Sequence, residues 1–393
     1  MVNGPPSHRL LPYCRSVVAR RLIGGSGPTV GALVVVAAWT AWWASRAWSV
    51  SGLSWHFFAD GGRWLTGPHA LHVYADHPEL QTGPLSLLVA ACLRVLPSGA
   101  AEKTALVAMT AAGPLLLAAL VPLLPTARRT VRVLLAGLVL APAWTVLSVR
   151  WGHLDDVLAL IAVVAAVHAL CAGRPVLAGL AVAAAIACKP WALGTVGLLL
   201  SLPASAWAGS VATAVLGTSA AWLPFVLADS ATLTALRPNV ALVPSSGLHA
   251  LGVRGTVVPG WGRTAQLLGS TVTAAVAGLT GRWPGVLLVT VAVRLALDPQ
   301  DNAYYVGSAA LAAVLFDLLG TTWTVPWTTL VTVVVLWQPF VTDYAHRMTT
   351  THGLTHWWFA HPGAVGATHV GWSVAAVTLV LLVPGVGRAR ESV

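Results

Sequence analysis

Charged side chains are scarce in this sequence. Lys, Arg, Asp and Glu together make up 9% of the 393 residues, and the chain has only 12 acids. Hydrophobic residues make up 57%, and the mean hydropathy is +0.78, which is far from the composition of a soluble domain. These values exclude an ordinary water-soluble protein and indicate an integral membrane protein.

Cysteine is scarce as well. The four cysteines lie in or near apolar runs and have no paired spacing, so they are expected to act as small hydrophobic residues: Cys14, Cys92, Cys171 and Cys188. No disulfide or zinc framework is predicted. The formal net charge of +10 is typical of Arg-rich loops that face anionic lipid. Because basic and aromatic residues do not interleave, nucleic acid is not an expected partner.

Thirteen apolar runs are long enough to cross or nearly cross a bilayer, which takes about 20 residues. They are continuous and do not alternate, which predicts helices and not barrel strands. The sequence therefore predicts an all-α, polytopic membrane helix bundle of about 12 spans, in which the runs at 84–97 and 175–188 are short enough to be broken or re-entrant. The runs are 29–49, 84–97, 104–125, 131–149, 157–171, 175–188, 191–205, 208–228, 264–280, 283–297, 304–320, 322–341 and 363–386.

Basic residues predict the orientation. Arginines precede the first run and follow the last, so the positive-inside rule assigns segment 1–28 and tail 387–393 to the cytoplasm, on either side of a single transmembrane domain at 29–386. Two cytoplasmic termini require an even number of crossings, so one run is not a full span. Arg128, Arg129 and Arg132 conflict with a simple count: the rule makes them cytoplasmic, whereas counting every run as a span places them outside.

Three polar segments interrupt the runs, at 50–83, 229–263 and 342–362. The first follows the first span and is expected to be an external loop. Its residues 55–65 mix aromatic and polar side chains before Gly67-Pro68, which predicts an interfacial helix on the membrane surface. Segment 229–263 has the Pro and Gly content of a second large external loop.

The few acids narrow the search for a site. Solitary acids near span ends or in predicted cytoplasmic stretches are set aside: Glu102, Glu391, Asp229, Asp317 and Asp343. Three groups remain: Asp60, Asp76 and Glu79 in the first loop, Asp155 and Asp156 in RWGHLDD, and Asp298 and Asp301 in RLALDPQDNAYY. Ionisable groups at membrane depth are costly, which makes each group a functional candidate. Helix capping is the alternative interpretation, above all for Asp155 and Asp156 before an apolar run.

Basic residues offer the complementary half of a site. Lys189 lies between two apolar runs, where Pro190 is expected to break the helix. A lysine at such a break can reach a phosphate at the interface, although ordinary snorkelling explains it equally well. The second external loop contributes further candidates to clamp an anion: Arg237, Arg254 and Arg263.

Histidines suggest a metal site as an alternative. One group lies in the first loop and another late in the chain: His69, His72, Asp76 and His77, then His352, His356, His361 and His369. No HExxH or Asp-x-Asp motif accompanies them, so interfacial aromatic belts are the simpler explanation. We predict neither a metal nor another cofactor.

Two stretches resemble a known family. SWHFFADGGRWLTG, followed by LHVYADHPELQTGPLSLL, resembles the first loop of bacterial polyprenyl-phosphate-mannose-dependent α-mannosyltransferases, which are GT-C fold membrane enzymes. GRPVLAGLAVAAAIACKPWALG resembles their Gly-Arg, Ala-Gly, Lys-Pro segment. The acid that opens the family's loop motif falls on Ser54, and its late Ser-Trp-x-His-His motif falls near Asp301, Asn302, Tyr304 and Tyr305.

The resemblance implies an inverting glycosyltransferase in the cell membrane, acting on the outer face. It would move a sugar, mannose first, from a polyprenyl phosphate to a glycan, glycolipid or peptide acceptor. One general base and cations on the leaving phosphate are enough for this reaction. Asp60 is the expected base, with Asp76, Glu79 and Asp156 as alternatives. The expected substrate ligands are Lys189, His56, Arg63, Tyr74, His153, Arg254, Asp301 and Tyr305.

The rival interpretation is a polytopic transporter or a non-catalytic membrane scaffold. Transporters commonly show internal repeats, and the sequence has no convincing repeat. The acids of a proton-coupled carrier are expected in mid-span, whereas most acids here lie at span ends. Both observations favour an interfacial enzyme.

Overall fold

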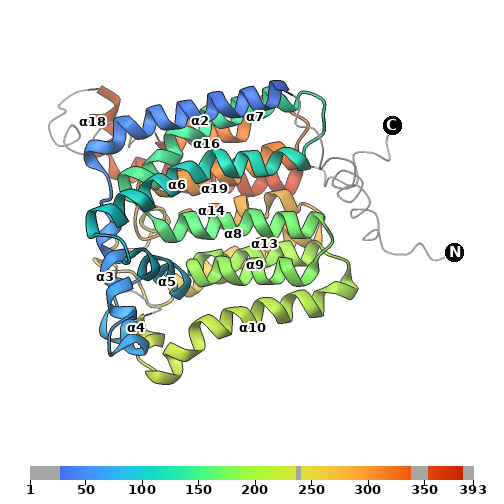
Figure 1. The fold of residues 1–393 in the computed structure, drawn as a ribbon. Coiled ribbons are helices and arrows are strands. Elements are labelled where there is room, and N and C mark those ends of the chain that lie inside the picture. Colours follow the sequence, from blue (N-terminus) through green and yellow to red (C-terminus); the bar gives the residue numbers. More distant parts are fainter. Residues whose placement is uncertain (1–26, 236–239, 338–352, 384–393) are drawn as a thin grey trace.

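The computed structural model describes residues 27–235, 240–337 and 353–383, and this part of the chain is helical, with one isolated β-bridge between Ala241 and Val257. The long helices lie side by side in one bundle (Figure 1). We call the end that carries residues 48–97 the loop end, and the end where α2 begins and α19 stops the terminal end. The predicted all-α class is confirmed for the described residues.

The helices fall into three stretches of the chain. The first contains α2 (Gly27–Ala47), η2 (Trp48–Val50), α3 (Trp55–Leu65), η3 (Ala70–His72), α4 (Val73–Asp76), α5 (Pro84–Leu93), α6 (Ser98–Leu120) and η4 (Val121–Leu123). The second contains α7 (Arg129–Thr145), η5 (Val146–Trp151), α8 (Leu154–Cys171), α9 (Pro175–Cys188), η6 (Pro190–Ser201) and α10 (Ala204–Ala228). The third contains α11 (Thr232–Ala235), α12 (Gly247–Ala250), α13 (Gly262–Leu279), η7 (Trp283–Gly285), α14 (Val286–Ala296), α15 (Tyr305–Leu315), η8 (Phe316–Gly320), α16 (Trp327–Trp337), α18 (Gly353–Ala360) and α19 (Pro362–Leu382).

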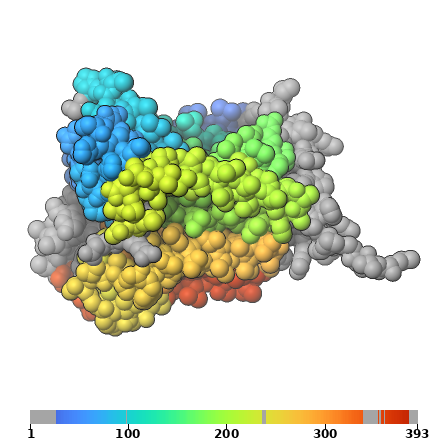
Figure 2. Space-filling view, turned by 90° about the horizontal axis from the view of Figure 1, so that it is seen from below, coloured from blue at the N-terminus to red at the C-terminus, as the bar shows by residue number. Residues whose placement is uncertain are grey.

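Six helical segments in the described residues are long and apolar enough to cross a membrane. They are Gly27–Val50, Gly99–Leu123, Arg129–Trp151, Leu154–Cys171, Ala204–Ala228 and Pro362–Leu382. Shorter apolar helices lie among them, including α9, η6 and α16. The protein is therefore a helical membrane protein, as its composition predicts. One long helix, α10, buries only Ser210, Ala214 and Phe225 and lies on the surface that Figure 2 shows.

Prolines set the breaks between helices. Lys189 is extended, with φ of −148°, and separates α9 from the 3₁₀-helix η6, so the break predicted at Pro190 is confirmed. Pro142 lies inside α7 just before the π-helix η5. Because proline has no N–H, the carbonyl of Leu138 loses its helical partner, and the indole Nε1 of Trp39 donates to it at 3.0 Å.

The run at 84–97 forms only the ten-residue helix α5. A helix of this length is about 15 Å long, half of the roughly 30 Å hydrocarbon core. Both of its ends lie at the loop end: the N–H of Gly83 donates to the carbonyl of Cys188, and Arg94 lies against the last turn of α3. This run therefore does not cross the bundle.

The conflict over the arginines at 128–132 arises only if the run at 84–97 is counted as a span, and α5 does not cross the bundle. Thr130 Oγ1 lies 2.9 Å from Thr29 Oγ1, at the beginning of α2. Arg129 and Arg132 therefore lie at the terminal end, beside the helix that the N-terminal arginines precede. The positive-inside rule places all of these arginines on one side.

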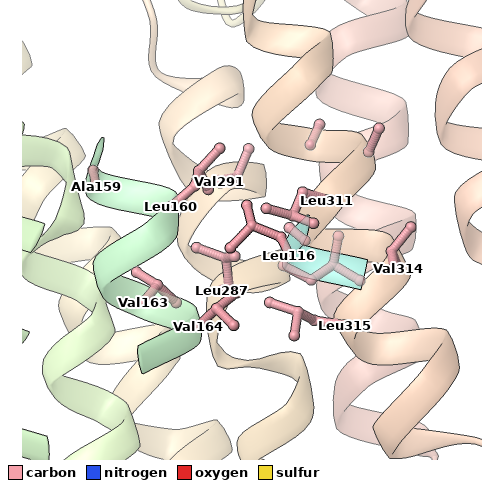
Figure 3. Packing of buried hydrophobic residues seen from close by; sticks show 14 of the residues in the cluster. Leu116, Ala159, Leu160, Val163, Val164, Leu287, Val291, Leu311, Val314 and Leu315 are labelled. Carbon is pink, nitrogen blue, oxygen red and sulfur yellow. The ribbon is translucent and has the colours of Figure 1, made fainter. Parts of the chain in front are cut away.

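A layer of packed hydrocarbon crosses the middle of the bundle. Leu116 of α6, Leu160 and Val164 of α8, Leu287 of α14 and Leu311 of α15 point toward one another (Figure 3). All five side chains are buried. Beyond this layer, toward the terminal end, the Asp317 carboxylate accepts hydrogen bonds from the N–H groups of Thr328 and Thr329 and from the Thr329 hydroxyl. Asp317 therefore fixes the start of α16.

We expect Asp317→Ala to destabilise the fold by about 2 kcal/mol, because it removes the cap of α16 and leaves buried donors without an acceptor. Thermal unfolding of the detergent-solubilised protein measures the effect. Asp76→Ala, at an exposed acid paired with His69, is the matched control. An Asp317→Ala protein as stable as the control would contradict the capping role.

Candidate active site

The first loop is fastened to the bundle beside a polar cluster. The N–H groups of Gly52, Leu53 and Ser54 donate to the carbonyls of Val149, Arg150 and Trp151 at 2.9, 3.1 and 2.8 Å. The Ser54 hydroxyl then lies 3.1 Å from Nε2 of His153. Ser54, where the family motif places its acid, therefore contacts the histidine of RWGHLDD.

Asp155 and Asp156 are both buried at the start of α8. Asp155 pairs with the ammonium of Lys189, which the break at Pro190 holds between α9 and η6. His153 Nδ1 lies 3.3 Å from Asp155 Oδ1 and 3.6 Å from Asp156 Oδ2. Asp155 Oδ1 also accepts from the N–H of Asp156 at 2.8 Å. The pair therefore joins a buried ionic cluster in addition to its position at a helix start.

Asp156 is held from the opposite side by η6 and α14. The indole Nε1 of Trp191 donates to Asp156 Oδ1 at 2.7 Å, and Arg294 Nη1 lies 3.3 Å from the same oxygen. The other oxygen, Oδ2, accepts no hydrogen bond from a described residue, although Lys189 Nζ lies 3.8 Å away. Two cations and a histidine thus surround two carboxylates without satisfying every oxygen.

Asp298 is the third buried acid of this cluster. Its oxygens accept from the Tyr305 hydroxyl at 3.2 Å, from Gln266 Nε2 at 3.1 Å and from the N–H of Gln300 at 3.0 Å. Arg294 Nε lies 3.9 Å away, one helical turn earlier. The Arg294 guanidinium also lies 4.4 Å from the centre of the Tyr305 ring, a cation–π geometry. Arg294 therefore links the Asp156 and Asp298 parts of the cluster.

A pocket of about 560 Å³, including its open mouth, lies on this cluster. Its polar lining comes from η6, α13, α14 and the turns beside them, and its aromatic lining surrounds the same space. The residues that matter for its chemistry are Gln81, Lys189, Trp191, Arg263, Gln266, Arg294, Asp298, Gln300, Tyr304 and Tyr305. Three of them are cations and one is an acid, so the lining itself favours an anion.

Arg263 is the cation best placed to bind an added anion. Its Nη1 donates to Gln266 Oε1 at 2.6 Å, and no carboxylate of the described residues forms an ion pair with it. Over the whole cluster, Lys189, Arg263 and Arg294 balance Asp155, Asp156 and Asp298. Because Lys189 and Arg294 already contact Asp155 and Asp156, Arg263 is the cation of the pocket lining that forms no ion pair with a described residue.

The structure separates the first-loop candidates from this cluster. Asp60 is 41% exposed and pairs with Arg63 at 2.9 Å, beside a different hollow. Asp76 pairs with His69 at 3.6 Å and Glu79 with His77 at 3.3 Å, all on the surface of the loop end. His56 is exposed and lies against the ring of Phe57. The four catalytic candidates therefore do not converge, and only Asp156 belongs to the cluster.

Of the other predicted substrate ligands, some belong to the cluster and some lie elsewhere. Lys189, His153 and Tyr305 join the cluster, as described. Tyr74 is buried, donates to the carbonyl of Thr82 at 3.1 Å, and has its pKa raised by burial, which is the pattern of a structural tyrosine. Arg254 is exposed and donates to the carbonyl of His249. Asp301 is half-buried just beyond the pocket lining, and Arg237 lies outside the described residues.

The histidine group of the first loop forms separate pairs and no common centre. His72 Nδ1 lies 3.3 Å from Asp229 Oδ2, and the N–H of Ala231 and this imidazole lower the pKa of Asp229. His77 stacks on Trp64, with ring centres 3.4 Å apart. Of the late group, His352 lies outside the described residues, His361 contacts the Trp357 carbonyl and His369 is buried.

Three side chains of the cluster lie close enough together to hold a metal ion. One ligand atom from each of His153, Asp155 and Asp156 lies within 4.8 Å of the others. Lys189 and Arg294, however, already place two positive charges on these carboxylates. The protein thus supplies from its own side chains the cations that such a group of acids requires, and we assign no metal to it.

Reasoning from sequence missed Arg294, Trp191, Gln266 and the central place of Asp298. Arg294 and Asp298 are four residues apart, the spacing of neighbours on a helix face, and this was the available signal. The contact of Arg294 with Asp156 joins residues 138 positions apart, which no local pattern encodes.

Comparisons with protein-family models, curated proteins and solved structures found no match for this chain.

We expect Lys189→Met to destabilise the protein by roughly 3–5 kcal/mol, because it leaves a buried carboxylate without its cation. The double variant Lys189→Met/Asp155→Asn removes both charges and is expected to recover a large part of the loss. Denaturant or thermal unfolding in detergent measures both. A double variant no more stable than Lys189→Met would contradict the pairing.

Proposed function

We propose that this protein is a GT-C-type glycosyltransferase that moves a sugar from a polyprenyl phosphate to an acceptor hydroxyl. The observation that carries the proposal is the loop-end pocket, where Lys189, Arg263 and Arg294 line the space with Asp298 as the lining acid. The phosphate of a lipid-linked donor is an anion at the membrane surface. An anion-binding pocket at one end of a membrane bundle suits it, and the family resemblance points to the same substrate.

The reaction needs little from the protein. The acceptor oxygen attacks the anomeric carbon, the bond from that carbon to the phosphate oxygen breaks, and direct displacement inverts the anomeric centre. The acceptor proton passes to a carboxylate, and the charge on the departing phosphate is stabilised by fixed cations. A second flanking carboxylate, as in glycoside hydrolases, is not required.

The pocket suggests a role for each residue. Arg263 is the proposed first phosphate ligand because no described carboxylate pairs with it, and Lys189 is the second. Asp298 is the proposed base because it is the acid that lines the pocket, with Asp156 behind it as the alternative. Trp191 and Tyr305 offer ring faces and Gln266 an amide for a sugar. Asp60, the base expected from sequence, stays a prediction to be tested beside them.

The packing beneath the pocket suits an enzyme that acts at one membrane surface. A carrier alternates access between the two membrane faces. Below the cluster, the buried side chains of Leu116, Leu160, Leu287 and Leu311 close the bundle (Figure 3). A site that opens at one end only supports a reaction at that surface.

The proposed topology has twelve passes, with both termini in the cytoplasm and the loop end outside the cell membrane. It counts the six long helical segments and six shorter elements, which are α9, η6, α13, α14, α15 with η8, and α16. Helix α5 is left out because both of its ends lie at the loop end. An even count agrees with cytoplasmic arginines at both ends of the chain.

Single cysteines test this topology. In a background with the native cysteines replaced by serine, a membrane-impermeant maleimide is expected to label Glu79→Cys from outside intact cells. Ala127→Cys, at the terminal end, is expected to react only after permeabilisation. Labelling of both positions from the same side would overturn the twelve-pass proposal.

A transfer assay tests the activity. Purified protein is given radiolabelled polyprenyl-phosphate sugars, mannose first, and a membrane extract as the source of acceptors. We expect Asp298→Asn to lower the rate of transfer by roughly 10²- to 10⁴-fold, as loss of a general base does. Arg263→Gln is expected to raise the KM for the donor, because it removes a phosphate ligand.

Arg254→Gln is the matched control for Arg263→Gln, since Arg254 lies in the same loop region but outside the pocket lining. Full activity of Asp298→Asn together with loss of activity in Asp60→Asn would show that the general base is Asp60 in the first loop. Absence of transfer from every donor by folded wild-type protein would overturn the proposed function itself.

A further inference from the structure

A second hollow lies at the loop end, between α3, α5 and the first turns of α6. It has a volume of about 1210 Å³, including its wide mouth, and shares no lining residue with the pocket described above. We call it the α3–α6 hollow. Its lining is Gly52, Trp55, His56, Ala59, Asp60, Arg63, Ala90, Arg94, Leu96, Gly99, Ala101 and Glu102.

The walls of this hollow are fixed by close contacts. Gly62 of α3 lies so near α5 that a Cβ there would come within 2.8 Å of the Ala91 nitrogen. Arg94 donates to the Thr66 hydroxyl and lies 3.5 Å from the carbonyls of Gly62 and Arg63, at the end of α3. On the opposite wall Gly52, with φ of +67°, lies against the Glu102 carboxylate, which a Cβ would overlap.

Two opposite charges in the hollow have no ionic partner. Asp60 and Arg63 neutralise each other. Glu102, by contrast, forms no ion pair with any described residue, and Arg94 donates only to the hydroxyl and carbonyls of the α3 terminus. The contact of Glu102 with Gly52 places it at the loop end, which is the outer end in the topology proposed above, whereas the sequence alone predicts a cytoplasmic stretch for it. The hollow thus holds one acid and one base that do not meet each other.

Helices α5 and α6 also carry exposed apolar side chains outside the lining of the hollow. Leu88 and Val95 on the α5 side are 53% and 87% exposed, and Val107 of α6 is 57% exposed. Exposed apolar surface on the helices that form a polar hollow suits a ligand that has a charged head and hydrocarbon chains. Because the hollow lies at one end of a membrane bundle, phospholipid is the ligand that surrounds it.

We propose that the α3–α6 hollow binds the headgroup of phosphatidylethanolamine, with its ammonium on Glu102 and its phosphate on Arg94. The head carries both charges, as the hollow does. Phosphatidylcholine has no N–H to donate to Glu102, and phosphatidylglycerol has no cation for it. A bound lipid would bridge α6 to the end of α3 and hold the first loop against the bundle.

Lipid exchange on the purified full-length protein tests the proposal. The detergent-solubilised protein is offered equimolar phosphatidylethanolamine, phosphatidylcholine and phosphatidylglycerol of identical chains, and the retained lipids are counted by native mass spectrometry. We expect phosphatidylethanolamine to be preferred about fivefold, the effect of one charge-assisted contact at an exposed site. Glu102→Gln is expected to abolish this preference.

Two further variants separate the site from general lipid binding. Gly99→Leu adds a side chain where no atom lies within 4 Å of a Cβ, so it is expected to fill the hollow and reduce retention without disturbing the fold. Glu79→Gln, at an exposed acid elsewhere on the same end, is expected to keep the wild-type preference. Equal retention of the three lipids by wild type, or an unchanged preference in Glu102→Gln and Gly99→Leu, would overturn the proposal and leave Glu102 and Arg94 as hydrated surface charges.

Discussion

The structure depends on keeping two adjacent carboxylates buried inside a membrane bundle. Asp155 and Asp156 have almost no exposed surface, and such charges are tolerated only with partners. Lys189 is delivered by the break between α9 and η6, and Arg294 by the last turn of α14. Three segments distant in sequence must therefore meet at one point, and the loop-end pocket forms where they meet.

The first loop is also held beside the buried carboxylates. Ser54 contacts His153, and the backbone of residues 52–54 hydrogen-bonds to the last residues of η5. The loop is consequently part of the frame that encloses the ionic cluster. Below it lies a layer of packed hydrocarbon, which separates this ionic cluster from the buried Asp317 toward the terminal end.

Sequence reasoning reached the features that local chemistry determines. Composition indicates the membrane, the aromatic and polar pattern of residues 55–65 indicates α3, and Pro190 indicates the break after Lys189. It failed where tertiary contacts decide. The run at 84–97 is recognisably marginal in sequence, but only the contacts of its two ends show that it does not cross the bundle, and Arg294 at the end of an apolar run cannot be told from a snorkelling arginine. The sequence favours Asp60 over Asp156 as the base, yet only Asp156 is buried among cations.

The 3₁₀ winding of η6 has a consequence for the reach and the surface of that segment. At about 2.0 Å per residue, its 12 residues cover roughly 24 Å, a distance for which an α-helix needs about sixteen. Its side chains also recur every third position, so Gly194 and Gly197 fall in line with Trp191. Those glycines contact Thr290 of α14 and the backbone of Ala274 in α13. The triplet spacing of W-A-L-G-T-V-G thus puts Trp191, Gly194 and Gly197 on one face of η6. The tryptophan lies at the pocket, and the two glycines let α13 and α14 pack closely below it.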